Sequence, residues 1–391
     1  MAKIIDLAYW VLILTIFMSG ELLQGRTISN AVDKAIVKTI KAGTDEIIDC
    51  YDIHIQPSLN HPLLYNHTIQ TTPSSSPKEI KSNNYGTLQL TQTWHKYGSC
   101  PQGSVPIRRK GKDNNPALLH NYHHPKSSPY KITNASQPNS LGANNHEYAA
   151  IKAHGNFLGA QAKINLWKPV LEIPAEFSVS QIWVVGEGDG PLNSVEAGWI
   201  VGRADNLTKF FIYFTADGYG STGCYNLDCN GFVQTSSSIV PDCSFTEMST
   251  FKGGQKDATF SIHKDQSSGN WWVEVQGTQV GYYPSSLFKQ LSNMATTVSW
   301  GGEILNWKDQ RRHTSTQMGS GHLPSEGGLG ISSYFNWVQV FDANNTAKNP
   351  ENVEKFITNP NCYDLEIDDH HLDTNGYGFY YGGPGYSNKC Q

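Results

Sequence analysis

The stretch Trp271-Trp-Val-Glu-Val-Gln276 decides the fold of the C-terminal part of this 391-residue chain. Successive side chains of a strand point to opposite faces, so Trp271, Val273 and Val275 share one apolar face. Similar blocks recur at Phe177–Val185, Phe210–Thr215, Val298–Trp300 and Tyr334–Phe341. No helical stretches of 10–15 residues alternate with these blocks, as a parallel α/β sheet would require. We therefore predict an all-β fold, with one antiparallel β-sandwich domain over residues 146–391.

The composition agrees with this fold and excludes several functions. Only 16% of the residues are charged, and the chain has 36 Gly, 19 Tyr and 10 Trp. Such a chain favours short strands and glycine-rich turns over coiled coils or helical repeats. The net charge of −5 leaves no basic excess to neutralise phosphates, so we expect no nucleic-acid partner.

Residues 1–25 have the pattern of a secretory signal peptide. A basic Lys3 precedes an apolar run from Leu7 to Met18, and the small residues Ser19-Gly20 follow. The run is short for a membrane span, although a signal anchor or a buried helix is an alternative. We expect a secreted protein, extracellular or in a cell wall, with a vacuole as the alternative and no membrane contact after signal removal. Four Asn-x-Ser/Thr triplets could then accept glycans, at Asn66, Asn134, Asn206 and Asn344.

Residues 26–145 differ from the rest because they are rich in Pro, Ser, Asn and His. Apolar residues recur every four positions at Ile28, Val32, Ile36 and Ile40, which predicts a short amphipathic helix within residues 27–42. The basic cluster Arg108–Lys112 follows, and exposed loops of this kind are where processing occurs. We expect a small mixed module and a linker that precede the β-sandwich.

Several familiar sites are missing from the sequence. It contains no phosphate-binding glycine loop, no His-Glu-x-x-His helix and no Gly-x-Ser-x-Gly elbow. Cys224 and Cys229 have no second Cys/His pair at zinc spacing nearby, which favours a disulfide loop over a metal site. The pairs His123-His124 and His370-His371 form no metal motif, because adjacent residues of an extended chain point in opposite directions. We expect neither a metal nor a cofactor.

Two glutamates stand among small residues in predicted strands. In Asn193-Ser-Val-Glu196-Ala-Gly198, alternation places Glu196 on the same face as Ser194 and Gly198. In Val298-Ser-Trp-Gly301-Gly-Glu303, it places Glu303 with Ser299 and Gly301. Each carboxylate would stand over an uncrowded strip that admits an extended ligand, unless both are ordinary solvent-facing strand residues.

Two carboxyl groups that face one cleft can divide the chemistry of hydrolysis. One stays ionised and activates water, and its neighbour stays protonated and donates to the leaving group. This chemistry hydrolyses either glycosides or peptides.

The chain also carries a series of distinctive blocks in a fixed order. They include Asp49-Cys-Tyr-Asp-Ile-His-Ile-Gln-Pro57, His146-Glu-Tyr-Ala149, Gly159-Ala-Gln-Ala-Lys-Ile-Asn-Leu-Trp-Lys-Pro169, Phe177-Ser-Val-Ser-Gln-Ile-Trp183, Glu196-Ala-Gly-Trp199, Gly223-Cys-Tyr-Asn-Leu-Asp-Cys229 and Trp300-Gly-Gly-Glu303. In these blocks the chain resembles the neprosin family of plant secreted glutamic peptidases, and its N-terminal half resembles that family's activation peptide.

The resemblance implies a function and a pair of catalytic residues. Glu196 and Glu303 match the family's two catalytic glutamates, although the sequence does not indicate which is acid and which is base. The implied protein is a zymogen whose pro-segment acts as an intramolecular inhibitor and is removed at acid pH. The mature form would be an endopeptidase that cleaves proteins or peptides after proline, and we expect a monomer.

The resemblance also pairs Cys224 with Cys229 and Cys362 with Cys390. We expect Cys50 and Cys100 to pair within the pro-segment, which leaves Cys243 as a buried free thiol. Two other functions remain open. One is a secreted carbohydrate-active or carbohydrate-binding β-sandwich, since carboxylate pairs and aromatic residues also serve sugars. The other is a family member without catalytic activity.

Overall fold

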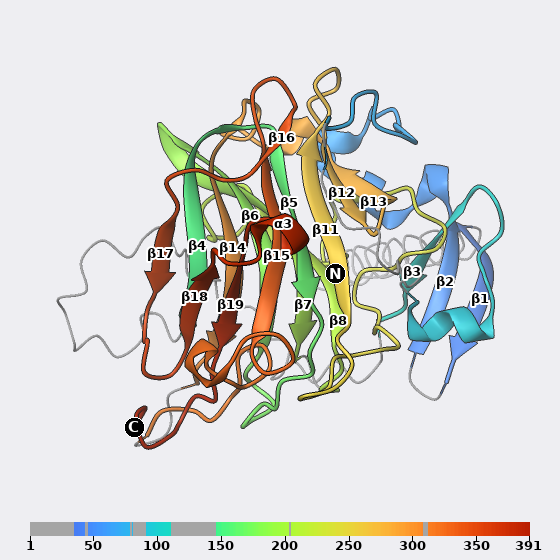
Figure 1. The fold of residues 1–391 in the computed structure, drawn as a ribbon. Coiled ribbons are helices and arrows are strands. Elements are labelled where there is room, and N and C mark those ends of the chain that lie inside the picture. The colour runs from blue at the N-terminus through green and yellow to red at the C-terminus, as the bar shows by residue number, and fades with distance from the viewer. Residues whose placement is uncertain are drawn as a thin grey trace, which may run out of the picture.

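The chain folds into two large sheets that face each other, with a small third sheet at one side (Figure 1). The computed structural model describes residues 35–43, 46–78, 80, 91–110, 146–202, 205–307 and 312–391. The predicted signal peptide, Asn134 and the linker before residue 146 lie outside these residues. The all-β prediction is confirmed, because all named strand pairs in the two large sheets are antiparallel.

The first large sheet has seven strands and carries both candidate glutamates. In spatial order its strands are β17 (Glu354–Ile357), β4 (His146–Phe157), β14 (Ala295–Leu305), β6 (Ser178–Gly188), β7 (Gly190–Val201), β8 (Lys209–Thr215) and β9 (Gly223–Tyr225). The central strands β14, β6 and β7 are 11 or 12 residues long. They therefore form a continuous surface on which side chains from distant parts of the sequence meet.

The second large sheet has nine strands and closes the sandwich. Its order is β10 (Val233–Gln234), β13 (Thr278–Tyr283), β12 (Trp271–Val275), β11 (Asp257–Lys264), β5 (Gly159–Asn165), β15 (Ser333–Phe341), β19 (Gly378–Gly382) and β18 (Asp364–Asp368), and β16 (Ala347–Lys348) also pairs with β15. One-turn elements lie in the connections: η5 (Ser285–Leu287), η6 (Pro324–Glu326) and α3 (Leu372–Asn375). Among the described residues, no helix has the length and apolar character needed to cross a bilayer.

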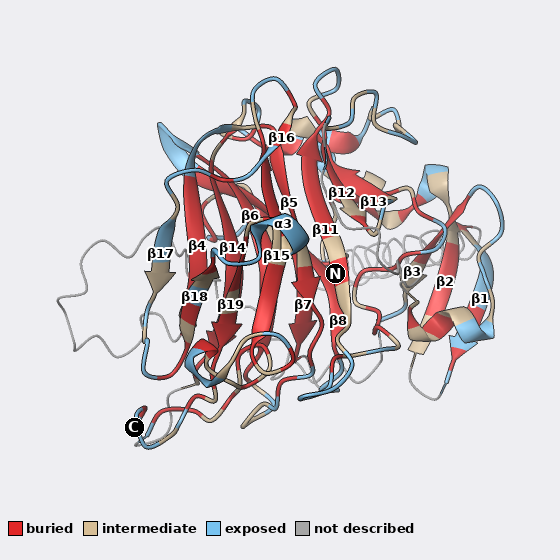
Figure 2. Cartoon of the chain, viewed as in Figure 1, coloured by how far each residue is buried: buried red, intermediate tan, exposed pale blue. Residues whose placement is uncertain are grey.

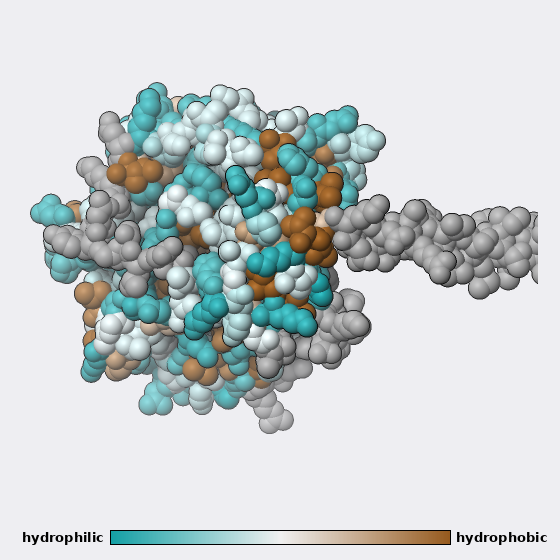
Figure 3. Space-filling view, turned by 90° about the vertical axis from the view of Figure 1, so that its right-hand side faces the viewer, coloured by the Kyte–Doolittle hydropathy of each residue, from teal (hydrophilic) through white to brown (hydrophobic). Residues whose placement is uncertain are grey.

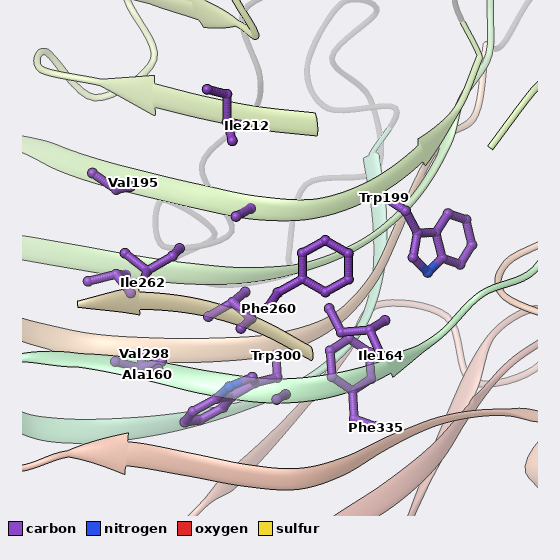
Figure 4. Close-up of a cluster of buried hydrophobic side chains, with 14 of the residues drawn as sticks. Ala160, Ile164, Val195, Trp199, Ile212, Phe260, Ile262, Val298, Trp300 and Phe335 are labelled. Carbon is purple, nitrogen blue, oxygen red and sulfur yellow. The ribbon is translucent and has the colours of Figure 1, made fainter. Parts of the chain in front are cut away.

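The core fills the space between the two sheets (Figure 2). Side chains from both sheets interdigitate there, such as Val195 and Trp300 from the first and Ile164 and Phe260 from the second (Figure 4). The alternation predicted for β12 is confirmed, because Trp271, Val273 and Val275 belong to this core. Burial of such large apolar side chains is the main force that holds the sheets together.

The N-terminal part of the chain forms a three-stranded sheet of its own. It consists of β1 (Ile36–Ala42), β2 (Glu46–Asp52) and β3 (Ser104–Arg108), and short turns join them: η1 (Ile53–Ile55), η2 (Pro57–Asn60), η3 (Pro62–Leu64) and η4 (Thr93–Tyr97). The predicted helix is wrong over Ile36–Ala42, which is a strand paired with β2. A four-residue spacing fits one face of a strand as well as one face of a helix. Ile40 is buried on the inner face of this strand, so pairing and packing decided the outcome.

The cysteines form three disulfides, Cys50–Cys100, Cys224–Cys229 and Cys362–Cys390. These are the pairs expected from the sequence, and Cys243 is a buried free thiol as expected. Of the four possible glycan acceptors, Asn66, Asn206 and Asn344 are exposed. An exposed asparagine is accessible to a glycosylating enzyme, so these three positions remain candidates.

Candidate active site

Glu196 on β7 and Glu303 on β14 lie on the same face of the seven-stranded sheet. The strand β6 runs between them, and Glu303 is paired with Val179 while Glu196 is paired with Trp183. Paired residues share a face, and so do alternate residues of one strand. Because Val179, Gln181 and Trp183 alternate along β6, both glutamates and Gln181 point to one side. The neighbours of the glutamates in the sequence, such as Val195 and Ile304, point into the core on the other side.

Glu303 is held by nitrogen and hydroxyl donors on both of its oxygens. Its Oε1 lies 2.7 Å from His146 Nδ1 and accepts from the Tyr148 hydroxyl at 3.3 Å. Its Oε2 accepts from Gln181 Nε2 at 2.7 Å. His146 and Tyr148 come from β4, which pairs with β14, so the strand register brings them to the carboxylate. Donors on both oxygens fix the orientation of this buried carboxylate.

Glu196 is held by hydroxyl groups. Its Oε1 accepts from Ser194 Oγ at 2.8 Å and from the Tyr219 hydroxyl at 2.7 Å. Tyr219 adopts a φ of 63°, a conformation that is rare outside glycine and often found at functional sites.

The turn that carries Tyr219 is held by Asp217. The Asp217 carboxylate accepts from the backbone N–H groups of Gly220, Ser221 and Thr222. Burial acts to raise the pKa of Asp217, but these donors hold it well below its ordinary value. The carboxylate therefore stays ionised in acid and keeps the turn, and with it the Tyr219 hydroxyl, in position.

Between the glutamates lies a row of paired residues across β14, β6 and β7, and two of these residues are glycines. Gln181 on β6 is paired with Gly301 on β14 and with Gly198 on β7. A Cβ at Gly198 would lie 2.0 Å from the Ser180 carbonyl oxygen, and one at Gly301 would lie 2.3 Å from that of Ala149. No side chain fits at either position, so Gln181 has a bare backbone on each side. The two glycines stand at the positions that the sequence places on the face of the glutamates.

Both carboxyl groups are buried in the full-length chain, where Glu196 and Glu303 are each 0% exposed. Aromatic side chains pack on the same face, among them Tyr148, Trp183 and Tyr213. The alternative of two solvent-facing glutamates is therefore wrong for the full-length chain. Buried carboxyl groups in a low-dielectric, hydrogen-bonded site are suited to acid and base chemistry.

Sequence reasoning missed the residues that contact the two glutamates. His146, Tyr148 and Gln181 all lie in the blocks that carry the family resemblance, but nothing local connects them to Glu303. One signal could have found Gln181, since it is a polar residue between Val179 and Trp183 on the glutamate-bearing face of β6.

The histidine and cysteine positions considered for metals do not come together as a metal site in the part of the chain that the structure describes. Cys224 and Cys229 are joined in a disulfide. His313 lies close to Cys362 and Cys390, but both sulfur atoms belong to a disulfide and cannot act as thiolate ligands. His123 and His124 lie outside the described residues.

Fold and site together define an antiparallel β-sandwich protein with a pair of buried glutamates on one sheet face. The chain belongs to the neprosin family, because the neprosin family model matches residues 174–384, more than half of the chain. The model of the neprosin activation peptide matches residues 39–152, ahead of the catalytic domain. These matches support a peptidase with an intramolecular pro-segment.

Solved structures with some similarity include two peptidases and a lectin. Scytalido-glutamic peptidase with a peptide-based transition-state analogue has a TM-score of 0.34 at 10% identity, and the match covers 62% of this chain and 98% of that chain. SCP-B of the Eqolisin family, in a complex with the tripeptide Ala-Ile-His, has a TM-score of 0.33 at 9% identity, with 62% and 98% covered. CG-16, a homodimeric agglutinin from chicken liver, has a TM-score of 0.21 at 10% identity, with 39% and 92% covered. At these TM-scores the similarity carries no argument about function.

Proposed function

We propose that the chain is the precursor of a glutamic endopeptidase that is active in acid and cleaves after proline. The observation that carries the proposal is the placement of Glu196 and Glu303 on one sheet face, on either side of the Gly301, Gln181 and Gly198 row. A peptide in an extended conformation fits over such a strip, because no side chain projects from the two glycines. The preference for proline rests on the family alone.

The contacts of the two carboxyl groups favour different roles. Glu303 faces an imidazole nitrogen and an amide N–H, and such donors favour a carboxylate over a carboxylic acid. Glu196 faces hydroxyl groups, which can accept a hydrogen bond as well as donate one. We therefore assign the general base to Glu303 and the general acid to Glu196.

The reaction then runs in two steps. Glu303 takes a proton from water as the water oxygen attacks the carbonyl carbon, while protonated Glu196 donates a hydrogen bond to the carbonyl oxygen. Glu196 next gives its proton to the amide nitrogen, the C–N bond breaks, and a carboxylic acid and an amine leave. Glu303 now holds a proton and Glu196 lacks one, and exchange with solvent restores the starting state.

The burial of both glutamates supports a latent precursor. A peptide cannot reach side chains that are 0% exposed, so the site must be uncovered before it acts. The match to an activation peptide independently supports a precursor that becomes active when its pro-segment is removed. Export through the N-terminal signal, glycosylation at Asn66, Asn134, Asn206 and Asn344, and a monomeric mature enzyme complete the proposal.

The proposal is tested by incubating purified precursor at pH 3–5 with a quenched fluorescent peptide that contains one proline, and in parallel with a panel of polysaccharides. We expect cleavage of the peptide on the carboxyl side of proline, identified by mass spectrometry. Release of sugars without peptide cleavage would favour the carbohydrate-active alternative. No reaction with either substrate, after the pro-segment has been removed, would favour a non-catalytic protein.

A further inference from the structure

Two glutamines of the pro-segment bind backbone groups of the peptidase domain in the same way. Gln56 Nε2 donates to the Gln234 carbonyl oxygen at 3.0 Å, and the Gln234 N–H donates to Gln56 Oε1 at 2.9 Å. Gln92 Nε2 donates to the Val240 carbonyl oxygen at 2.7 Å, and the Val240 N–H donates to Gln92 Oε1 at 2.9 Å. Each amide thus makes the two hydrogen bonds that a neighbouring strand would make.

The first of these contacts completes an open sheet edge. Gln234 lies in β10, the terminal strand of the nine-stranded sheet, and a terminal strand has unpaired N–H and C=O groups. The contact is mutual, because Gln234 Nε2 donates to the Pro106 carbonyl oxygen on β3 at 2.8 Å. Gln56 is 1% exposed and Gln92 is 0% exposed. Loss of either amide would leave buried backbone groups without partners.

A third anchor is the carboxylate of Asp265, on the loop between β11 and β12. Asp265 accepts hydrogen bonds from Ser74 Oγ at 2.6 Å, from Ser75 Oγ at 3.0 Å and from Gln70 Nε2 at 2.5 Å. Burial acts to raise the pKa of Asp265, but the donors from the pro-segment hold it well below its ordinary value. This anchor therefore persists in acid.

Apolar contacts surround these polar anchors. One cluster joins Ile40, Ile48 and Trp94 of the pro-segment to Val240 and Cys243 of the peptidase domain. A second cluster joins Leu64 to Val233, Trp272 and Tyr282. The side of the molecule that carries the three-stranded sheet shows groups of hydrophobic residues among hydrophilic ones on its outer surface (Figure 3).

These contacts lie apart from the glutamates in the fold. Gln234 belongs to the nine-stranded sheet and Asp265 to the loop between two of its strands, whereas Glu196 and Glu303 belong to the seven-stranded sheet. Val240 lies in the connection between β10 and β11. No disulfide joins the two parts, because Cys50–Cys100 lies within the pro-segment and the other two lie within the peptidase domain. Besides the continuous chain, non-covalent contacts hold the pro-segment to the domain, including an ion pair between Arg108 and Asp242 at 2.6 Å.

We propose that the surface around Gln234, Val240 and Asp265 is a docking site for the pro-segment, and that this surface recognises Gln56 and Gln92. Once the linker is cut, the surface retains the pro-segment as a separate, non-covalently bound chain. A surface of this kind fits a partner with two extended glutamines and a serine-rich segment that donates hydrogen bonds to Asp265. The inference holds whether or not Glu196 and Glu303 act as proposed, since the docking contacts include neither glutamate.

The experiment uses the full chain with a recognition sequence for an added protease placed within residues 112–145. A Glu303→Gln background prevents self-digestion. After the cut at pH 7, we expect both pieces to elute together on size exclusion. Cys243, the one free thiol, reports independently, because it is buried beneath the pro-segment cluster and should stay unlabelled by a thiol reagent. Separate elution together with rapid labelling of Cys243 would overturn the proposal.

The role of the glutamines is tested with Gln56→Ala and Gln92→Ala, each in the cut chain. Gln102, which is exposed on the same segment, supplies the matched control Gln102→Ala. We expect each test variant to raise the rate of Cys243 labelling at least roughly 10-fold over the control, since two buried backbone groups lose their partners. Rates equal to that of the control would show that the glutamines are not what the surface recognises.

Discussion

Replacing Gln181 with leucine should lower peptidase activity much more than a comparable change elsewhere in the sandwich. The amide donates to Glu303 Oε2 at 2.7 Å in a fully buried site. A hydrogen bond to a charged group contributes about 1.5–3 kcal/mol. If the same contact is needed in the transition state, Gln181→Leu lowers kcat/KM by roughly 10- to 150-fold.

The matched control is Gln161→Leu in the nine-stranded sheet. Gln161 is buried on β5 and donates to Gln339 Oε1 at 2.8 Å, so it also loses one buried amide contact. Thermal unfolding of the two precursors should show similar decreases in Tm, of roughly 3–10 °C. Activity of the activated enzymes on a proline-containing peptide should fall only in Gln181→Leu. Equal activity of the two variants would refute the reasoning that Gln181 serves the catalytic carboxylate.

Three further predictions concern stability. Gly198→Ala should lower Tm by roughly 6–12 °C, because its Cβ would lie 2.0 Å from the Ser180 carbonyl oxygen and overpacking of this kind costs about 3 kcal/mol. The control Gly254→Ala, whose Cβ would have nothing within 4 Å, should leave Tm unchanged. Similar Tm values for the two variants would contradict the packing argument. Burial lowers the pKa of His263 to about 4, so the folded state resists protonation and stability should fall by about 3 kcal/mol as the pH drops from 6.5 towards 4. His263→Phe should flatten that decline in urea midpoints measured across this pH range, and an unchanged slope would assign the decline to other groups. Removing the Cys362–Cys390 disulfide should lower the free energy of unfolding by about 3–4 kcal/mol, and removing Cys224–Cys229 should lower it by about 2 kcal/mol, because the first closes the longer loop. A larger loss for Cys224–Cys229 in chemical denaturation would contradict the loop-entropy estimate.

Alternation alone was sufficient to predict much of the fold and one aspect of the site. The faces of Glu196 and Glu303 follow from a period of two, because both glutamates lie in long regular strands with apolar neighbours that face the core. Reading the spacing of four between Ile36 and Ile40 as a helix was wrong, because this spacing fits helix and strand equally. The pairing of β1 with β2 decides in favour of the strand.

His146, Tyr148 and Tyr219, three partners of the glutamates, could not be predicted from the sequence. His146 and Glu303 are 157 residues apart, and they meet only because β4 pairs with β14 in one particular register. Tyr219 reaches Glu196 from a turn with a φ of 63°, which no periodic pattern reveals. The docking glutamines depend in the same way on an open sheet edge, a property of the assembled sheet.

The most direct test of the account measures kcat/KM at acidic pH for Glu196→Gln, Glu303→Gln, the double variant and Glu274→Gln. Glu274 lies on β12 of the other sheet and serves as the matched control. If the two glutamates act as one catalytic pair, each single variant should lose roughly 10³-fold or more, and the double variant should be little worse than the poorer single one. Activity within about 10-fold of the control in either single variant would contradict the account.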